Sequence, residues 1–143
     1  MTQASASVAV FLSEARVARL ATADQWLKPH VVPICYVYDG RSFFTALDRK
    51  PKKVPGHKLK RVRNILENQN VSLVVDEYDE DWSRLRYVIV NGKATLLRSG
   101  AEHEKAIVLL NQKYAQYSKM RLTELKTSVI KIQPHKIISW GKF

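Results

Sequence analysis

The spacing of apolar residues changes along the chain, and each spacing predicts a different secondary structure. Residues 4–15 carry apolar side chains at three- and four-residue intervals, which is typical of an amphipathic helix. Over residues 16–23 the period becomes two, which predicts a strand that ends in a turn at Asp24-Gln25. The same two patterns predict further strands at residues 28–38, 41–47, 71–75, 85–97 and 128–140, and further helices at residues 58–67 and 102–114.

Two of these strands, residues 28–38 and 41–47, are joined by Asp39-Gly40 and form the clearest hairpin in the sequence. Asp-Gly suits a two-residue turn, because both central residues of such a turn need positive φ. Pro29 and Pro33 cannot donate a hydrogen bond to a neighbouring strand. We therefore expect residues 28–38 to form an edge strand that is bulged or bent.

The predicted order is helix, three strands, helix, two strands, helix and strand. Short turns between consecutive strands favour antiparallel pairing over parallel crossovers. Asn91-Gly92, inside the strand at residues 85–97, indicates a bulge. Six strands of this length can close as a small barrel. The sequence therefore predicts a mainly β fold with flanking helices: a mostly antiparallel, six-stranded barrel forming a single domain over residues 1–143.

The composition is that of an ordinary globular domain, with 143 residues of which 45% are hydrophobic and 26% are charged. No apolar run approaches the roughly 18 residues that a membrane helix needs. The first residues lack the basic stretch that opens a signal peptide. The single cysteine, Cys35, cannot form an internal disulfide. We expect a cytoplasmic protein without a membrane partner.

The charge balance is uneven, with 24 Lys and Arg against 13 Asp and Glu, and it favours an anionic partner. The cations gather in one segment and an acidic run, residues 76–81, follows it. The basic segment contains Arg49, Lys50, Lys52, Lys53, His57, Lys58, Lys60, Arg61 and Arg63. Because a buried hairpin leads directly into this segment and into a helix start, we predict an anion-binding site there.

Particular residues are candidates for this anion site. Thr45 and Ala46, at the end of a strand, offer a hydroxyl and backbone N–H groups. Lys58, Arg61 and Asn64 recur at three-residue spacing and share a helix face. The candidate ligands are therefore Thr45, Ala46, Lys53, Lys58, Arg61 and Asn64.

Motifs for several other chemistries are missing. The sequence contains no G-x-G-x-x-G, no Walker A loop and no G-x-S-x-G. Its four histidines lack metal-ligand spacing, and the acidic run does not fit a calcium loop, so no metal site is predicted. His30 is interpreted as a polar residue at a strand end.

Several segments, taken in order, resemble the pyridoxamine-phosphate-oxidase-like split β-barrel family over roughly residues 10–141. The segments are Leu20-Ala21-Thr22-Ala23-Asp24, Pro29-His30-Val31-Val32-Pro33, Asp39-Gly40, Asp48-Arg49-Lys50-Pro51-Lys52, Leu59-Lys60-Arg61-Val62-Arg63-Asn64 and Val71-Ser72-Leu73-Val74-Val75-Asp76. Two later segments, Tyr78-Asp79-Glu80-Asp81-Trp82 and Ser139-Trp140, resemble a subgroup described as using the deazaflavin coenzyme.

The resemblance implies a six-stranded split barrel of the FMN-binding type, a homodimer, and a flavin-type cofactor, FMN or deazaflavin, at the dimer interface. By position, Val32, Pro33, Thr45 and Ala46 would line the ring and the ribityl chain. The phosphate-binding cation of the family falls on Arg61, with Lys53 and Lys58 as helpers. Trp82 would reach across from the other subunit.

The sequence also departs from the family. Residues 51–58 form a longer loop than in many relatives, and the turn at Asp24-Gln25-Trp26 lacks the usual glycine. The terminal Arg-rich substrate motif of pyridoxine-phosphate oxidases is missing, so vitamin synthesis is not expected.

The function that we expect is hydride transfer between the bound cofactor and a small organic substrate; no catalytic side chain is assigned. A non-catalytic flavin-binding or carrier protein is one alternative. A basic nucleic-acid-binding barrel is another, which the lack of aromatic residues other than His57 between Arg49 and Arg63 disfavours.

Overall fold

The structure, a computed structural model, describes residues 2–47, 59–119 and 127–143. The helices are α1 (Ala6–Glu14), α2 (Lys60–Glu67), α3 (Ala101–Lys113) and α4 (Ala115–Lys119), with a short 3-10 helix η2 (Trp82–Arg84). The strands are β1 (Ala18–Ala23), β2 (Pro29–Ile34), β3 (Val37–Tyr38), β4 (Phe43–Ala46), β5 (Asn70–Glu77), β6 (Arg86–Leu97) and β7 (Val129–Trp140).

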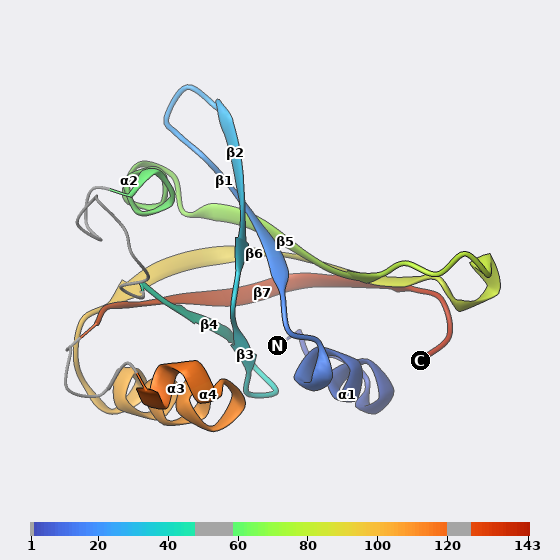
Figure 1. The fold of residues 1–143 in the computed structure, drawn as a ribbon. Coiled ribbons are helices and arrows are strands. Elements are labelled where there is room, and N and C mark those ends of the chain that lie inside the picture. Colours follow the sequence, from blue (N-terminus) through green and yellow to red (C-terminus); the bar gives the residue numbers. More distant parts are fainter. Residues whose placement is uncertain (1, 48–58, 120–126) are drawn as a thin grey trace.

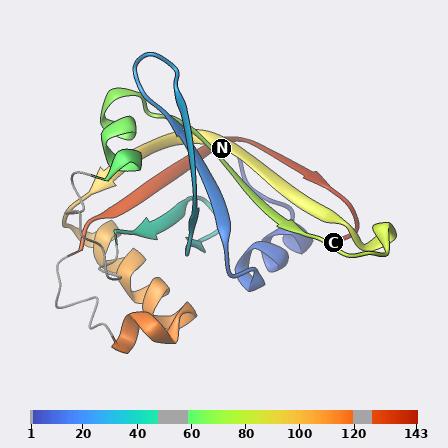
Figure 2. The same cartoon turned by 45° about the horizontal axis from the view of Figure 1, so that its top comes forward.

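All seven strands belong to one antiparallel sheet, in the order β2-β1-β5-β6-β7-β4-β3. The sheet curls, so that β1 and β2 cross β6 and β7 at a steep angle (Figure 1). Helices α1, α2 and α3 lie around this sheet, as the turned view also shows (Figure 2). The prediction of a mainly β, antiparallel fold with flanking helices is confirmed.

The sheet has seven strands where six were predicted, because the predicted strand at residues 28–38 breaks at Cys35 and Tyr36 into β2 and β3. The peptide groups of Tyr36 are satisfied by a side chain instead of a strand. The Tyr114 hydroxyl accepts from the Tyr36 N–H at 3.1 Å and lies 3.0 Å from the Tyr36 carbonyl oxygen. The chain thus leaves one edge of the sheet at β2 and enters the other edge at β3.

The predicted two-residue turn at Asp39-Gly40 is also wrong. Tyr38 pairs with Phe43, so four residues connect β3 to β4. The Asp39 carboxylate accepts from the backbone N–H groups of Arg41 and Ser42 at 2.9 and 2.8 Å, which stabilises the longer loop.

Two other local predictions are confirmed. Strand β2, which contains Pro29 and Pro33, lies at an edge of the sheet. The register of β6 against β7 shifts between Asn91 and Gly92. A Cβ at Gly92 would come within 2.4 Å of the Gln133 carbonyl oxygen, so only glycine fits at this bulge.

The buried apolar side chains form two clusters. The larger one lies between α1, α2 and the inner face of the curled sheet, and the smaller one joins β3, β4 and β7 to α3 and α4. Within the described part of the chain, no helix is both long and apolar enough to cross a membrane.

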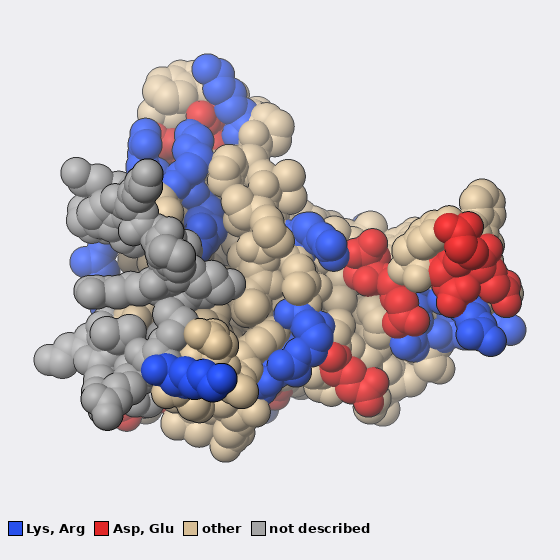
Figure 3. All heavy atoms as spheres, viewed as in Figure 1, with Lys and Arg blue, Asp and Glu red and all other residues tan. Residues whose placement is uncertain are grey.

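The molecule has two ends of different character. At one end lie α2 and the turn between β1 and β2, with Lys28, Lys60, Arg61 and Arg63; we call this the basic end. At the other end residues 76–86, which comprise the end of β5, η2 and the start of β6, extend away from the body; we call them the acidic arm (Figure 1). Acidic side chains gather on this arm in the space-filling view (Figure 3).

Candidate functional site

The basic end is built around α2, whose buried face differs from the predicted one. Val62 and Ile65 are buried as expected, but Leu66 is 65% exposed. Asn64, expected on the ligand-binding face, is fully buried. The helix therefore buries the Asn64 amide and leaves Leu66, a residue of the predicted apolar stripe, exposed.

Asn64 joins a polar cluster, which we define as Thr22, His30, Arg61 and Asn64. Its amide nitrogen Nδ2 donates to the Thr22 hydroxyl at 3.0 Å. Thr22 is the register partner of His30 across β1 and β2, so these two side chains share one face of the sheet. Arg61 is half-buried one turn before Asn64 on α2.

Two polar atoms of this cluster stand out. His30 Nδ1 and Asn64 Oδ1 are both buried, and neither has a hydrogen-bond partner among the residues that the structure describes. A buried polar atom without a partner costs about 1–3 kcal/mol, so these two atoms are candidate contacts for a bound group. A guanidinium, an imidazole and an amide suit a ligand that combines negative charge with hydroxyl groups.

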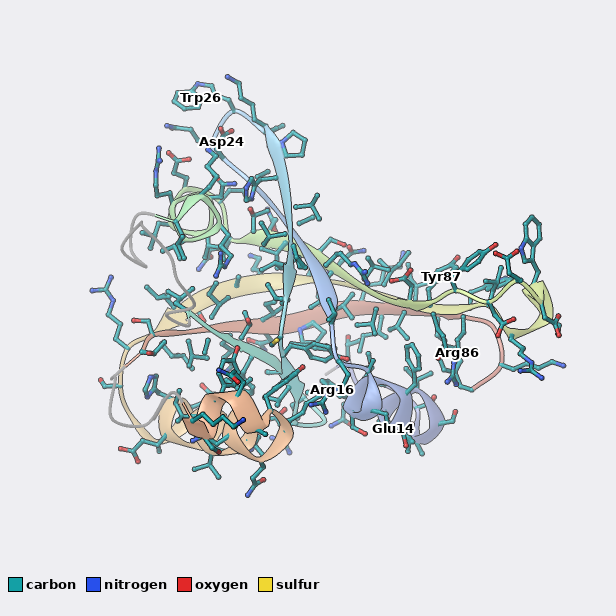
Figure 4. All side chains as sticks on the ribbon, in the orientation of Figure 1. Glu14, Arg16, Asp24, Trp26, Arg86 and Tyr87 are labelled. Atoms are coloured by element: carbon teal, nitrogen blue, oxygen red, sulfur yellow. The ribbon has the colours of Figure 1, made fainter. Side chains whose placement is uncertain are left out.

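The turn between β1 and β2 contacts α2 and is organised by Asp24 (Figure 4). Its carboxylate accepts from the backbone N–H groups of Lys28 and Trp26 at 3.0 and 2.9 Å, and Lys60 Nζ on α2 lies 3.7 Å away. The Lys28 N–H first, then the Trp26 N–H and the Lys60 charge, hold the pKa of Asp24 below its usual value. The turn also places Leu27 in the left-handed region, with φ of 64°.

The residues expected to line a cofactor ring divide between two strands. On β2, Val32 is half-buried against the main core and Pro33 is exposed. On β4, Thr45 and Ala46 are buried and pair with Ile130 and Val129 of β7.

The backbone of β4 is open on its other side. The ladder between β3 and β4 ends at Phe44, so no described strand covers the β3 side of Thr45 and Ala46. The C-terminal end of β4 and α2 lie at the same end of the molecule in both ribbon views (Figures 1 and 2).

The structure therefore brings Arg61 and Asn64 together and places Thr45 and Ala46 at the same end. Lys53 and Lys58 lie outside the described residues. Trp82 is 70% exposed on η2, at the opposite end of the molecule, so one chain cannot combine it with Arg61 in a single site.

Sequence reasoning missed Thr22 and His30 as members of the cluster. The signal that could have found them is the turn at residues 24–28: pairing the flanking strands outward from it places Thr22 opposite His30.

The acidic arm has a different surface. At its base Tyr87 stacks on Trp140 with ring centres 5.8 Å apart, and a pocket of about 410 Å³ opens beside them. Figure 4 shows Arg86 and Tyr87 on opposite sides of β6, and the Arg86 guanidinium lies 4.6 Å from the centre of the Phe11 ring and 3.0 Å from the Glu77 carboxylate. Residues 2–47, 59–119 and 127–143 contain no group of three metal-ligating side chains, here or elsewhere.

Comparison with known proteins gives one family and several similar structures. A family model described as pyridoxamine 5'-phosphate oxidase matches residues 4–141. None of the curated proteins compared matches the chain.

The similar structures share the fold at low sequence identity. A conserved hypothetical protein from Mycobacterium tuberculosis is 21% identical, with a TM-score of 0.77 over 99% of this chain and 86% of its own. The heme storage protein HutZ from Vibrio cholerae is 16% identical, with a TM-score of 0.74 over 99% of this chain and 96% of its own. A FAD-binding protein from Mesorhizobium loti is 21% identical, with a TM-score of 0.67 over 96% of this chain and 95% of its own.

Proposed function

The chain belongs to the pyridoxamine 5'-phosphate oxidase family, and on that premise we propose that it is a homodimeric oxidoreductase dependent on a flavin-type cofactor. The cofactor is FMN or the deazaflavin coenzyme, and the substrate is a small organic molecule. The observation that carries this proposal is the polar cluster at the basic end, where His30 Nδ1 and Asn64 Oδ1 are buried without a described partner and Arg61 lies one turn before Asn64 on α2.

The residues of the cluster have separate roles in this proposal. Arg61 binds the cofactor phosphate, because charge-assisted hydrogen bonds to a guanidinium are among the strongest available to a protein. Lys53 and Lys58 add positive charge, which also suits the acidic tail of a deazaflavin. Asn64 positions α2 against β1 through Thr22 and presents its free Oδ1 to the ligand.

The chemistry divides between cofactor and protein. The bound ring supplies hydride transfer, as flavin-type cofactors do. Val32, Pro33, Thr45 and Ala46 orient the ring and the ribityl chain and exclude water from them. No residue is assigned as an acid or a base.

The separation of the two ends supports the proposal of a homodimer. Trp82 and Tyr78 on the acidic arm are 70% and 63% exposed, and the arm opposes the basic end in charge. A twofold arrangement, the commonest among dimers, lets the arm of each copy reach the basic end of the other. Trp82 then completes the cofactor site of the partner.

The test is a titration with FMN, and separately with the deazaflavin coenzyme, followed by fluorescence. Arg61→Ala should weaken binding of the preferred cofactor about ten- to a hundredfold, since one charge-assisted contact is worth about 1.5–3 kcal/mol. Arg63→Ala is the matched control, because Arg63 is exposed on the same helix. Lys60 is a poorer control, since its ammonium lies near Asp24.

Failure of both cofactors to bind at micromolar concentrations overturns the proposal. Equal binding by Arg61→Ala and Arg63→Ala overturns the assignment of the phosphate to Arg61 and leaves residues 50–53 as the next candidates.

A second candidate is a non-catalytic carrier of the cofactor or of heme. The half-buried His30 with its free Nδ1, on a fold shared with a heme storage protein, favours this alternative. Hemin is therefore titrated beside the flavins. A bound cofactor that is never reduced and reoxidised during turnover identifies a carrier.

A further inference from the structure

A pocket lies between α1, β3 and α3, on the side of the molecule away from α2 (Figure 1). It has a volume of about 300 Å³ and opens to solvent. Its lining is mostly apolar, with one amine: Ser13, Val37, Tyr38, Leu109, Gln112 and Lys113.

Lys113, the last residue of α3, is fixed at this pocket from both its backbone and its side chain. The Arg16 guanidinium donates to the Lys113 carbonyl oxygen at 2.7 Å. The Lys113 amine lies 4.0 Å from the centre of the Tyr36 ring and 5.4 Å from that of Tyr114. Its hydrogen bond to the Leu12 carbonyl oxygen is long, at 3.5 Å.

The charges around Lys113 differ from those around Lys105 and Lys131. Lys105 and Lys131 each have a carboxylate partner, at 3.2 and 2.7 Å. In the described part of the chain, Lys113 has no such ion pair, and its charged neighbour is Arg16, whose guanidinium lies 4.7 Å from the Tyr114 ring centre (Figure 4).

This environment changes the protonation of the amine. Burial, and then the Arg16 charge, lower the pKa of Lys113 to about 8, while the nearby Cys35 thiol acts in the opposite direction. Partial burial beside a second cation is an arrangement that activates a lysine as a nucleophile.

We propose that Lys113 is a reactive amine that condenses with a small uncharged aldehyde held in this pocket. The neutral amine nitrogen attacks the carbonyl carbon, both amine protons pass to the carbonyl oxygen, and that oxygen leaves as water. A C=N bond thus replaces the C=O bond, with no change in oxidation state. Val37, Tyr38 and Leu109 offer the aldehyde an apolar surface. The Arg16 guanidinium already contacts the Lys113 carbonyl oxygen and the Tyr114 ring. The proposed aldehyde therefore needs no anionic group to pair with Arg16.

The experiment exposes the purified protein to benzaldehyde with sodium cyanoborohydride, which delivers a hydride to the imine and fixes it as a secondary amine. Peptide mass spectrometry then compares Lys113 with Lys105, an internal reference on the same helix. At pH 7.5 Lys113 should be labelled at least tenfold faster, and its rate should level off above pH 8 while that of Lys105 continues to rise. Equal rates for the two lysines overturn the proposal.

A pocket variant separates binding from simple amine reactivity. Ser13 is exposed on α1, so Ser13→Tyr narrows the pocket without changing the core. It should slow labelling by benzaldehyde at least fivefold and labelling by formaldehyde less than twofold. If Ser13→Tyr, with an unchanged melting temperature, slows neither aldehyde, the pocket does not hold the ligand and the proposal fails. Lys113→Arg should carry no label in its peptide.

Discussion

The basic end and the acidic arm both carry hydrogen-bonding polar residues, but the surroundings of these residues are opposite. At the basic end Asn64 and Thr22 are 0% and 3% exposed, and the Asn64 Oδ1 atom stays without a partner in the described residues. On the arm the Asp81 carboxylate is exposed and accepts from both the backbone N–H and the hydroxyl of Ser83, at 3.1 and 2.7 Å.

This difference in burial and hydrogen bonding indicates two kinds of function, ligand binding at the basic end and contact with a partner at the arm. A polar group that is buried without a protein partner costs stability unless water or a ligand completes it, so it is a candidate contact for a ligand. An exposed polar group that hydrogen-bonds within its own turn stabilises the conformation of the loop. On the arm, the Asp81 turn in this way holds the exposed Trp82 where a partner can contact it. Each of the following predictions tests one side of this contrast.

The largest expected effect is at the buried amide. Asn64→Ala removes the hydrogen bond to Thr22 and leaves a small cavity, so it should lower the free energy of unfolding by about 2 kcal/mol. Urea denaturation followed by circular dichroism measures this loss. Asp81→Ala removes a comparable polar side chain from the arm. It should lower the free energy of unfolding clearly less than Asn64→Ala does, because water replaces the hydrogen bonds of the exposed carboxylate. Equal losses for the two variants would remove the distinction between the ends.

The second prediction concerns the opposite charges of the two ends in the proposed dimer. Glu80→Lys, on the arm, should raise the dimer dissociation constant about tenfold at low salt, since each reversal acts at both symmetric contacts. Sedimentation equilibrium measures the constant. Lys28→Glu at the basic end should have a similar effect, and combining the two reversals should restore part of the dimer affinity. If the double variant has a higher dimer dissociation constant than either single variant, the arm does not contact the basic end in the dimer.

The third prediction concerns acid. Because the folded pKa of Asp24 is lower than its unfolded value of 3.8, the stability that it contributes is complete above pH 3.8 and disappears as the pH falls through the folded pKa. Asp24→Asn should therefore flatten the acid side of the stability profile between pH 5 and pH 2.5, measured by urea midpoints. An unchanged acid limb would show that the turn does not depend on the Asp24 charge.

The smallest expected effect is a gain in stability at the tip of the same turn. Leu27 is 75% exposed at a φ of 64°, a conformation that is costly for a leucine. Leu27→Gly should stabilise the protein by about 0.5–1 kcal/mol, after allowing for the greater freedom of glycine in the unfolded chain. Thermal unfolding detects this change. A loss of stability would mean that the exposed leucine contributes packing that outweighs its strain.

Much of the fold could be predicted from the sequence, because period-two and period-3.6 patterns depend on residues close together in the chain. The edge position of β2 and the bulge at Gly92 follow from proline and glycine chemistry alone. The break at Tyr36 could not be predicted in this way, since the group that replaces its strand partner, the Tyr114 hydroxyl, lies 78 positions away.

The candidate site was predicted less completely for a related reason. Arg61 follows from the charge pattern and the family resemblance, whereas the burial of Asn64 depends on which face of α2 meets β1. Spacing places Leu66 on the apolar stripe, but the helix rotates so that Asn64 reaches Thr22. The orientation of α2 is therefore set by its contacts with other elements, which residue spacing alone does not show.

The dependence of Tyr36 on Tyr114 also bears on how the protein is made. A ribosome releases β1, β2, β3 and β4 long before residue 114, so the peptide groups of Tyr36 stay in contact with water until α3 has been synthesised. Strand β4 in turn pairs with β7, the last strand of the chain. The two edges of the sheet can therefore be fixed in place only near the end of synthesis, and the N-terminal half must remain soluble without them.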